Sequence, residues 1–298
     1  MGIKTLELNS LEEVFQTIES LDYRYVFRGQ PDSYFRLRST YFRFYEYASN
    51  RPPSDEFVIK DMDTIIKKFK SGLVRVGKLP KDNFTKSDWW EYARHWGVPS
   101  PLIDFTRSPY IGLYFAFEVQ GLTPEPKNEE RHVALYCIDF WYILAYRLRQ
   151  AWDLSTSGFW IEECDARFFE KVDTFCKPPG RGVPDKNSIR FILNPNKYSA
   201  RMIVQQGAFL CDTLDYNDEF QKFKDLEGYL EALPVNEKRK DPFIKIVMPY
   251  QALYKSILSR LVKMNICGTA LFLDSSGATK DVFNATAWPR YTLDVGGV

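Results

Sequence analysis

The chain has 298 residues, with 40 basic and 39 acidic side chains and a formal net charge of +1 at pH 7. Its 45% hydrophobic and 27% charged residues are typical of a globular protein and exclude wholesale disorder. The near-zero charge gives no general attraction to polyanions, so neither strong nucleic-acid binding nor membrane association is indicated. We see no internal repeat, low-complexity segment or linker, and therefore predict a single domain over residues 1–298.

The N-terminal residues show no basic stretch followed by an apolar one, so a signal peptide is not expected. The longest uncharged apolar stretch near the middle, 108–117, is about half as long as a membrane-spanning helix. The five cysteines are scattered and form no C-x-x-C pair, which argues against a disulfide framework and a zinc site. These observations predict a cytoplasmic protein without a metal.

The first half of the chain begins with a clear helix. Ser10 and Glu13 form a capping box, and the apolar residues after them recur at helical spacing. Further along we predict a strand at 23–28, a long helix from about residue 54, a helix at 88–96, a strand at 102–105 and a helix at 109–119. The basic run in the long helix (Lys67, Lys68 and Lys70) is interpreted as a solvated face.

In the second half the patterns predict strands at 133–138, 189–193, 201–211 and 243–248, a helix from about 251 and a last short strand at 269–273. Strands and helices alternate in irregular order. The sequence therefore predicts an α+β fold with a mixed or antiparallel central sheet flanked by helices.

Several chemistries are excluded by missing motifs. The two histidines, His95 and His132, have no metal-ligand spacing around them, and there is no G-x-S-x-G elbow, P-loop or G-x-G-x-x-G motif. Histidine-dependent triads and P-loop nucleotide hydrolysis are therefore not expected.

Two segments combine polar side chains with a rigid backbone. In Phe27-Arg28-Gly29-Gln30 an arginine lies on a strand of buried character, where its donors need an anionic partner. In the segment 95–109, His95, Asp104, Thr106, Arg107 and Ser108 are interleaved with one glycine and three prolines, which suits a preorganised binding site. The structural alternative is that Asp104 and Ser108 cap the next helix or that Asp104 pairs with Arg28, Arg94 or Arg107, while His95 is a core histidine.

These segments resemble the FRG domain, a family named for its Phe-Arg-Gly tripeptide that occurs mostly in bacteria and their phages. The resemblance is carried by 27–29, 93–99, 102–109 and 113–118, and further on by 201–209 and 271–277. It spans roughly residues 20–280.

The same residues show a more distant resemblance to arginine-dependent ADP-ribosyltransferases. It implies NAD as a substrate, with Arg28 and Gly29 at its phosphates and Thr106 and Ser108 at a ribose. Independently of the resemblance, the expected role of His95 is to stack beside a ring or to act as a general acid. The third-strand glutamate of those enzymes has no equivalent here, because Arg201 stands at its position. Gln205 and Gln206 are the nearest alternatives, and Asp104 or Glu118 could supply the charge. The expected catalytic residues are Arg28, Asp104 and Gln206.

The leading hypothesis is a protein that transfers ADP-ribose to a macromolecular acceptor or cleaves NAD, as a bacterial toxin or antiviral effector. The alternative is a non-catalytic nucleotide or partner-binding sensor, controlled by a regulatory protein, on the same fold. Losing a charged side chain that stabilises the transition state costs about 2–4 kcal/mol. Its absence here is the observation that favours the sensor.

Overall fold

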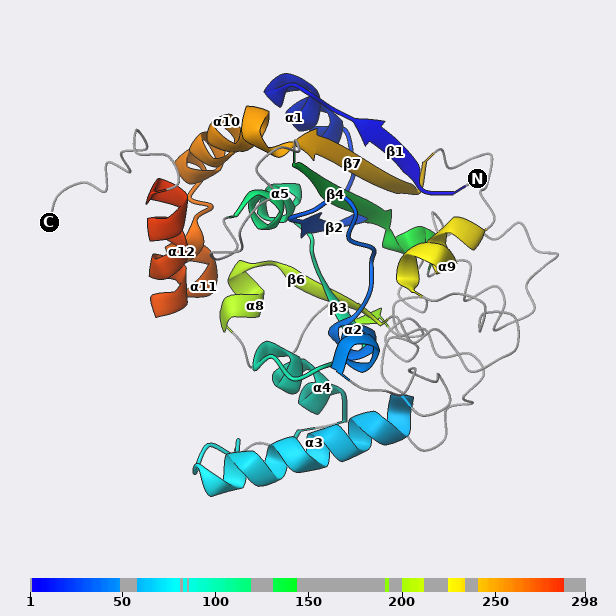
Figure 1. Cartoon of the computed structure of the whole chain (residues 1–298), viewed down its shortest axis with the longest axis vertical. Helices are drawn as coiled ribbons and strands as arrows, with labels where there is room; N and C mark the ends of the chain where they lie inside the picture. Colours follow the sequence, from blue (N-terminus) through cyan, green and yellow to red (C-terminus); the bar gives the residue numbers. More distant parts are fainter. Residues whose placement is uncertain are drawn as a thin grey trace, which may run out of the picture.

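The structure is a computed structural model that describes residues 2–48, 58–80, 83–84, 86–118, 131–143, 191–192, 200–211, 225–233 and 241–286. It contains a seven-stranded sheet in the order β1-β7-β4-β2-β3-β6-β5, with helices around it (Figure 1). β1 pairs with β7 in parallel and the other neighbours are antiparallel. The predicted α+β fold with a mixed sheet is confirmed.

The strands are β1 (Lys4–Glu7), β2 (Tyr25–Gln30), β3 (Leu102–Thr106), β4 (His132–Asp139), β5 (Phe191–Ile192), β6 (Gly207–Cys211) and β7 (Phe243–Pro249). The helices are α1 (Leu11–Glu19), α2 (Thr40–Ala48), α3 (Val58–Arg75), α4 (Lys86–His95), α5 (Pro109–Phe117), α8 (Ala200–Val204), α9 (Leu226–Ala232), α10 (Tyr250–Lys263), α11 (Gly268–Phe272) and α12 (Ser275–Thr286).

Local sequence signals explain where the best-predicted helices begin. Ser10 caps α1 through the backbone N–H of Glu13, and the Glu13 carboxylate accepts from the backbone N–H of Ser10, as the capping box predicts. Ser108 caps α5, whose first residue is Pro109. Both helices then bury apolar side chains against the sheet, and this packing stabilises them because helices this short are marginal on their own.

Three apolar clusters divide the interior. One lies between the sheet and helices α1, α5 and α10, and a second lies on the other face of the sheet beneath α9. The third joins α2, α3 and α4 to strands β3 and β6, and α3 and α4 form a separate layer at the lower end of the view (Figure 1). The pocket described below lies where this layer meets the rest of the sheet.

Two predicted strands are wrong. Of the predicted strand 201–211, only 207–211 is extended, because residues 200–204 form α8 and Gln206 has a φ of 48°. Gly207 follows this reversal and leaves room for the side chain of Met202, because a Cβ there would lie 2.2 Å from its Cε. The predicted strand 269–273 is helical over 268–272, since a short apolar run has no periodicity that separates strand from helix.

The Phe-Arg-Gly tripeptide follows the alternation of strand β2. Phe27 points into the cluster beneath α5, Arg28 points to the opposite face, and Gly29 returns to the α5 side. A Cβ on Gly29 would lie 2.1 Å from the carbonyl oxygen of Gly112 and 2.4 Å from the backbone nitrogen of Ala116. The glycine is therefore explained by the close approach of α5 to the strand.

We expect Gly29→Ala to lower the free energy of unfolding by about 3 kcal/mol, because the added methyl group meets backbone atoms that cannot rotate away. Chemical denaturation followed by circular dichroism measures the change. Gly72→Ala in α3 is the matched control, since a Cβ there has no neighbour within 4 Å. In a helix it should be neutral or stabilising by up to about 1 kcal/mol. Equal effects of the two variants would contradict the packing explanation.

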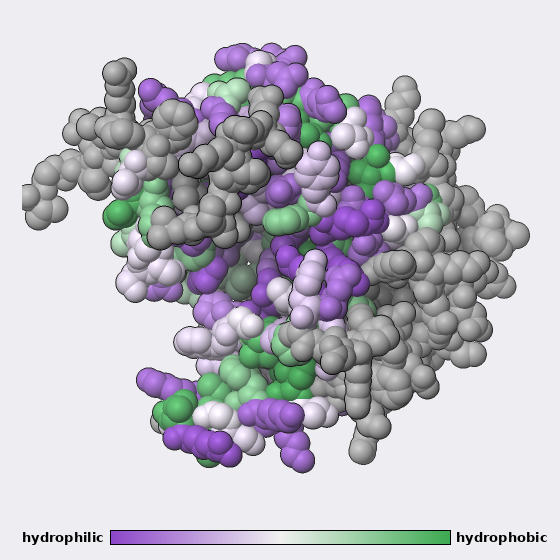
Figure 2. All heavy atoms as spheres, viewed as in Figure 1, coloured by the Kyte–Doolittle hydropathy of each residue, from purple (hydrophilic) through white to green (hydrophobic). Residues whose placement is uncertain are grey.

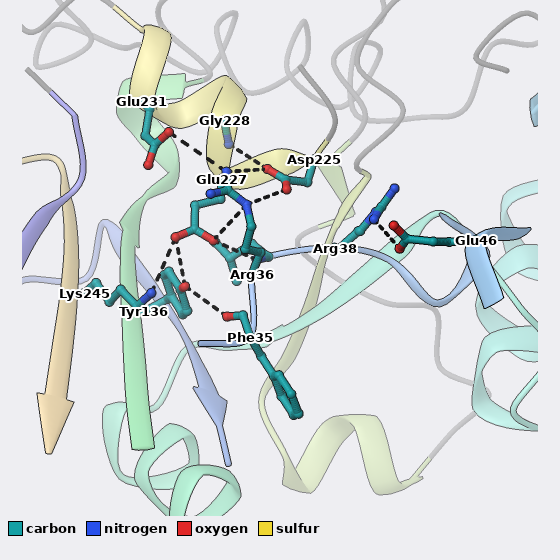
Figure 3. A network of polar contacts seen from close by, with 11 residues as sticks. Phe35, Arg36, Arg38, Glu46, Tyr136, Asp225, Glu227, Gly228, Glu231 and Lys245 are labelled. Carbon is teal, nitrogen blue, oxygen red and sulfur yellow. Dashed lines mark hydrogen bonds and ion pairs between the residues drawn. The ribbon is translucent and has the colours of Figure 1, made fainter. Parts of the chain in front are cut away.

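A charged network attaches α9 to the loop that follows β2 (Figure 3). Arg36 donates two hydrogen bonds to the Asp225 carboxylate, at 2.6 and 3.0 Å, and its Nε lies 3.8 Å from Glu227. Glu227 also accepts from the hydroxyl of Tyr136 and lies 3.5 Å from Lys245. This network is structural, because it joins α9, β4 and β7 around two nearly buried carboxylates.

Among the residues described here, no helix combines the length and the apolar character needed to cross a membrane.

Candidate functional site

The sheet opens between strands β2 and β3. They share a single register pair, Phe27 with Thr106, whereas β2 pairs with β4 along its whole length. A cavity of about 430 Å³ lies where the two strands separate, lined by both strands and by residues of α2, α4, α8 and β6. Hydrophilic side chains gather across the middle of the view in Figure 2, above the layer of α3 and α4.

Arg28 lies at the point where the strands separate. Its Nη1 donates to the carbonyl oxygen of Asp104 at 2.6 Å and lies 3.9 Å from that residue's carboxylate. The side chain is only 15% exposed, and its Nε has no hydrogen-bond partner among the described residues. Burial lowers the pKa of Arg28 to about 10, although Asp104 acts in the opposite direction. Arg28 is therefore a buried cation whose donors are incompletely used.

Three further arginines line the same cavity: Arg43 from α2, Arg94 from α4 and Arg201 from α8. The Asp104 carboxylate accepts a hydrogen bond from Arg94 and is the one acidic side chain among the described residues that line the cavity. The described lining of the cavity thus contains four arginines and a single carboxylate. Such an excess of planar cationic groups suits a ligand with phosphate or carboxylate groups.

The hydroxyl-bearing residues are used within the protein. Thr106 lines the cavity, and its hydroxyl donates to the carbonyl oxygen of Gln205 at 2.7 Å and accepts from the Ser108 N–H. Ser108 is not among the lining residues, because its hydroxyl caps α5. The structural alternative proposed for Ser108 is thus confirmed, whereas Asp104 lies within β3 and caps no helix.

The predicted glutamine is displaced by one position. Gln205 and Gly207 line the cavity but Gln206 does not. Gln206 adopts a left-handed conformation, and its carbonyl oxygen accepts from the backbone N–H of Arg107. The turn before β6 therefore brings the neighbours of Gln206 to the cavity.

His95 ends α4 at the rim of the cavity and is exposed, so the interpretation as a core histidine is wrong. Partial burial and the nearby Arg201 lower the pKa of His95, while Asp274 and Asp104 raise it. At neutral pH the ring is therefore uncharged and can accept as well as donate a hydrogen bond.

Glu118 does not reach the site. It follows α5, is buried, and forms an ion pair with Lys280 of α12 at 2.8 Å. The strand register that placed Arg201 at the position of a glutamate is also wrong, because Arg201 lies on α8. In the part of the chain that the structure describes, no group of three or more His, Cys, Asp or Glu side chains could hold a metal ion.

Sequence reasoning found Arg28, Gly29, His95, Asp104 and Thr106, which all line the cavity. It gave Arg43 and Arg94 no ligand-binding role. Arg94 had a signal, since it precedes His95 in the predicted helix 88–96 and is one of the three arginines considered as ion-pair partners of Asp104. Arg43 had no such signal, because nothing in the sequence of α2 indicates which of its residues lines the cavity.

The comparisons with known proteins identify one region of the chain. The family model of the FRG domain matches residues 23–123, about a third of the chain. No curated protein and no solved structure matches. The matched region holds Arg28, Arg43, Arg94 and Asp104, whereas Arg201 and Gln205 lie beyond it. The chain therefore contains an FRG domain, which supplies most of the charged side chains of the cavity.

Proposed function

We propose that the cavity binds a nucleotide with a pyrophosphate group, and that this nucleotide is NAD. The observation that carries the proposal is Arg28, a buried guanidinium with an unused donor at the point where the sheet opens. Leaving a buried donor of a charged group unsatisfied is costly, and a phosphate oxygen is a partner that matches the guanidinium in shape and charge. A protein that binds this nucleotide without cleaving it would act as a nucleotide sensor.

The remaining features of the cavity support the same ligand class. Arg43, Arg94 and Arg201 add positive charge around Arg28, and the volume of about 430 Å³ falls in the range of small-molecule sites. The lining also contains aromatic side chains, among them Phe35 and Phe115, which suit the planar rings of a nucleotide. NAD is chosen over other pyrophosphate nucleotides because the distant resemblance to ADP-ribosyltransferases implies NAD as the substrate.

Calorimetric titration of the purified chain with NAD and ADP-ribose tests the proposal. Adenosine and nicotinamide riboside are matched ligands, since they keep the rings and lack the pyrophosphate. We expect binding of NAD and ADP-ribose and little binding of the two nucleosides. Equal affinity for nucleosides and dinucleotides would show that the arginines do not recognise phosphate, and would end the proposal.

A second candidate function is cleavage of NAD or transfer of its ADP-ribose group, and it is favoured by Asp104. The side chain of Asp104 is 40% exposed within the cavity, beside Thr106 on β3. In such a reaction the bond between the nicotinamide nitrogen and the ribose C1′ breaks, and its electron pair leaves with nicotinamide. Water or an acceptor then bonds to C1′ and loses a proton, while a carboxylate stabilises the positive charge on the ribose.

Release of nicotinamide separates the two functions. Chromatography of NAD incubated with the protein, with and without protein or nucleic-acid acceptors, measures the cleavage. Binding without nicotinamide release favours the sensor, while release that is lost in Arg28→Met supports the enzyme. If the chain acts as a toxin or antiviral effector, expression in bacteria should slow growth for the wild type and not for that variant.

We expect the affinity for ADP-ribose to rise a few-fold as the pH falls from 7.5 to 6. In the free protein burial and Arg201 lower the pKa of His95, whereas a bound pyrophosphate raises it. Binding then takes up a proton, so the affinity increases with acidity, while the pyrophosphate charge stays constant in this range. Titrations at several pH values measure the slope. His95→Gln should flatten it, and an unchanged slope in that variant would assign the proton to another group.

A further inference from the structure

We infer that Asp104 is an internal counter-anion, which occupies the guanidinium of Arg94 and the edge of Arg28 until a phosphate group takes its place. Asp104 thereby determines how much negative charge the cavity accepts, and it acts on the ligand through the two arginines. This inference rests on the proposed nucleotide binding.

The position of the carboxylate is the first argument. Its side chain is 40% exposed, whereas those of Arg28 and Arg94 are 15% and 18% exposed. The carboxylate thus lies nearer to the solvent than the two cations that it contacts. A phosphate group that approaches from the solvent meets Asp104 at the guanidinium groups it would bind, and the two anions compete for the same donors.

The unused donors are the second argument. Nε of Arg28 and Nε of Arg94 are buried and have no hydrogen-bond partner among the described residues. A carboxylate placed only to stabilise two arginines would use their donors more fully, as the two hydrogen bonds between Arg36 and Asp225 do. Asp104 therefore compensates only part of the positive charge, and a phosphate group that displaces its carboxylate gains the two unused Nε donors as well.

The backbone makes the inference testable. Arg28 donates to the carbonyl oxygen of Asp104 at 2.6 Å, and β3 is held by its pairing with β6. Neither contact uses the carboxylate. Asp104→Asn removes the charge, keeps the shape of the side chain and leaves Arg28 attached to β3.

We expect Asp104→Asn to bind inorganic pyrophosphate and ADP-ribose about tenfold more tightly than the wild type. A like charge a few ångströms from the ligand costs about this much at an effective dielectric between those of a protein surface and water. The gain should be larger for inorganic pyrophosphate, which carries more charge. Without ligand the variant should unfold at a lower temperature than the wild type, because Arg94 loses its ion pair.

Calorimetric titration and thermal unfolding of the full chain measure these effects. Asp63→Asn in α3 is the control, since it changes the net charge equally but does not line the cavity. Should Asp104→Asn fail to fold, Asp104→Ser gives the second measurement. If Asp104 were purely structural, Asp104→Asn would bind the ligands equally well or more weakly. Either result in the folded variant overturns the inference and leaves the proposed nucleotide binding intact. If wild type and variant bind none of NAD, ADP-ribose and pyrophosphate, the proposed function fails as well.

Discussion

Arg28→Met should lower the affinity for NAD and ADP-ribose by at least about a hundredfold while leaving the free energy of unfolding unchanged or higher. A buried guanidinium paired with a phosphate commonly accounts for 2–5 kcal/mol when it is removed from a complex. In the free protein the same group is buried with an unused donor, and a methionine of similar volume replaces it without the cost of desolvating a charge. Affinity and stability thus change in opposite directions.

Calorimetry and chemical denaturation of the same preparation measure both quantities. Arg28→Lys is the informative second variant, because it keeps the charge and loses the forked pair of donors, so its affinity should fall between those of the wild type and Arg28→Met. A variant that unfolds more easily but binds NAD normally would identify Arg28 as a structural residue, joined to Asp104 only to close the sheet.

The sequence predicted the α+β fold because its strongest elements carry signals that tertiary contacts do not override. The capping box at Ser10 and the Ser108-Pro109 start each place a helix within one or two residues of its observed start. The end of β2 was less clear, since the predicted strand ends at Arg28 whereas Gly29 and Gln30 continue β2. There the packing of α5 on Gly29 decides the conformation, which a local pattern cannot show.

The sequence predicted only those residues of the candidate site that stand out within their own segment. Arg28 and Asp104 each stood out within their own segments, because a charged residue in an apolar strand needs an explanation. Arg43 did not stand out, and Arg201 was noted only at the position of the missing glutamate, since the place of both at the cavity depends on α2 and α8 approaching the opening between β2 and β3. That approach is a property of the folded chain: the pairing of β3 with β6 places α8 beside the cavity, some hundred residues after β3.

Arg28 and Arg36 show how two arginines eight positions apart take different roles. Both are close to acidic side chains in the folded chain. Arg36 is half exposed and uses two donors on Asp225, whose side chain is only 7% exposed. Arg28 is more deeply buried than its acidic neighbour. Arg36 therefore stabilises buried carboxylates, whereas the buried Arg28 keeps an unused donor, which is the donor that the proposed function assigns to the ligand.

Arg36→Met should therefore lower the free energy of unfolding by about 2 kcal/mol, and the midpoint of thermal unfolding by about 5 °C. The variant leaves Asp225 without its strongest partner and Glu227 without one of its cations, and both carboxylates are nearly buried. The loss stays below that of a fully buried ion pair, because Arg36 is half exposed and Glu227 keeps Lys245 and the hydroxyl of Tyr136.

The affinity of Arg36→Met for ADP-ribose should match that of the wild type, since Arg36 does not line the cavity. Thermal unfolding and calorimetry of Arg28→Met and Arg36→Met side by side therefore give a crossed result: one variant loses the ligand, and the other loses stability. Loss of both properties in both variants would mean that the cavity and the network around α9 unfold together. In that case the division between a binding arginine and a structural one would be wrong.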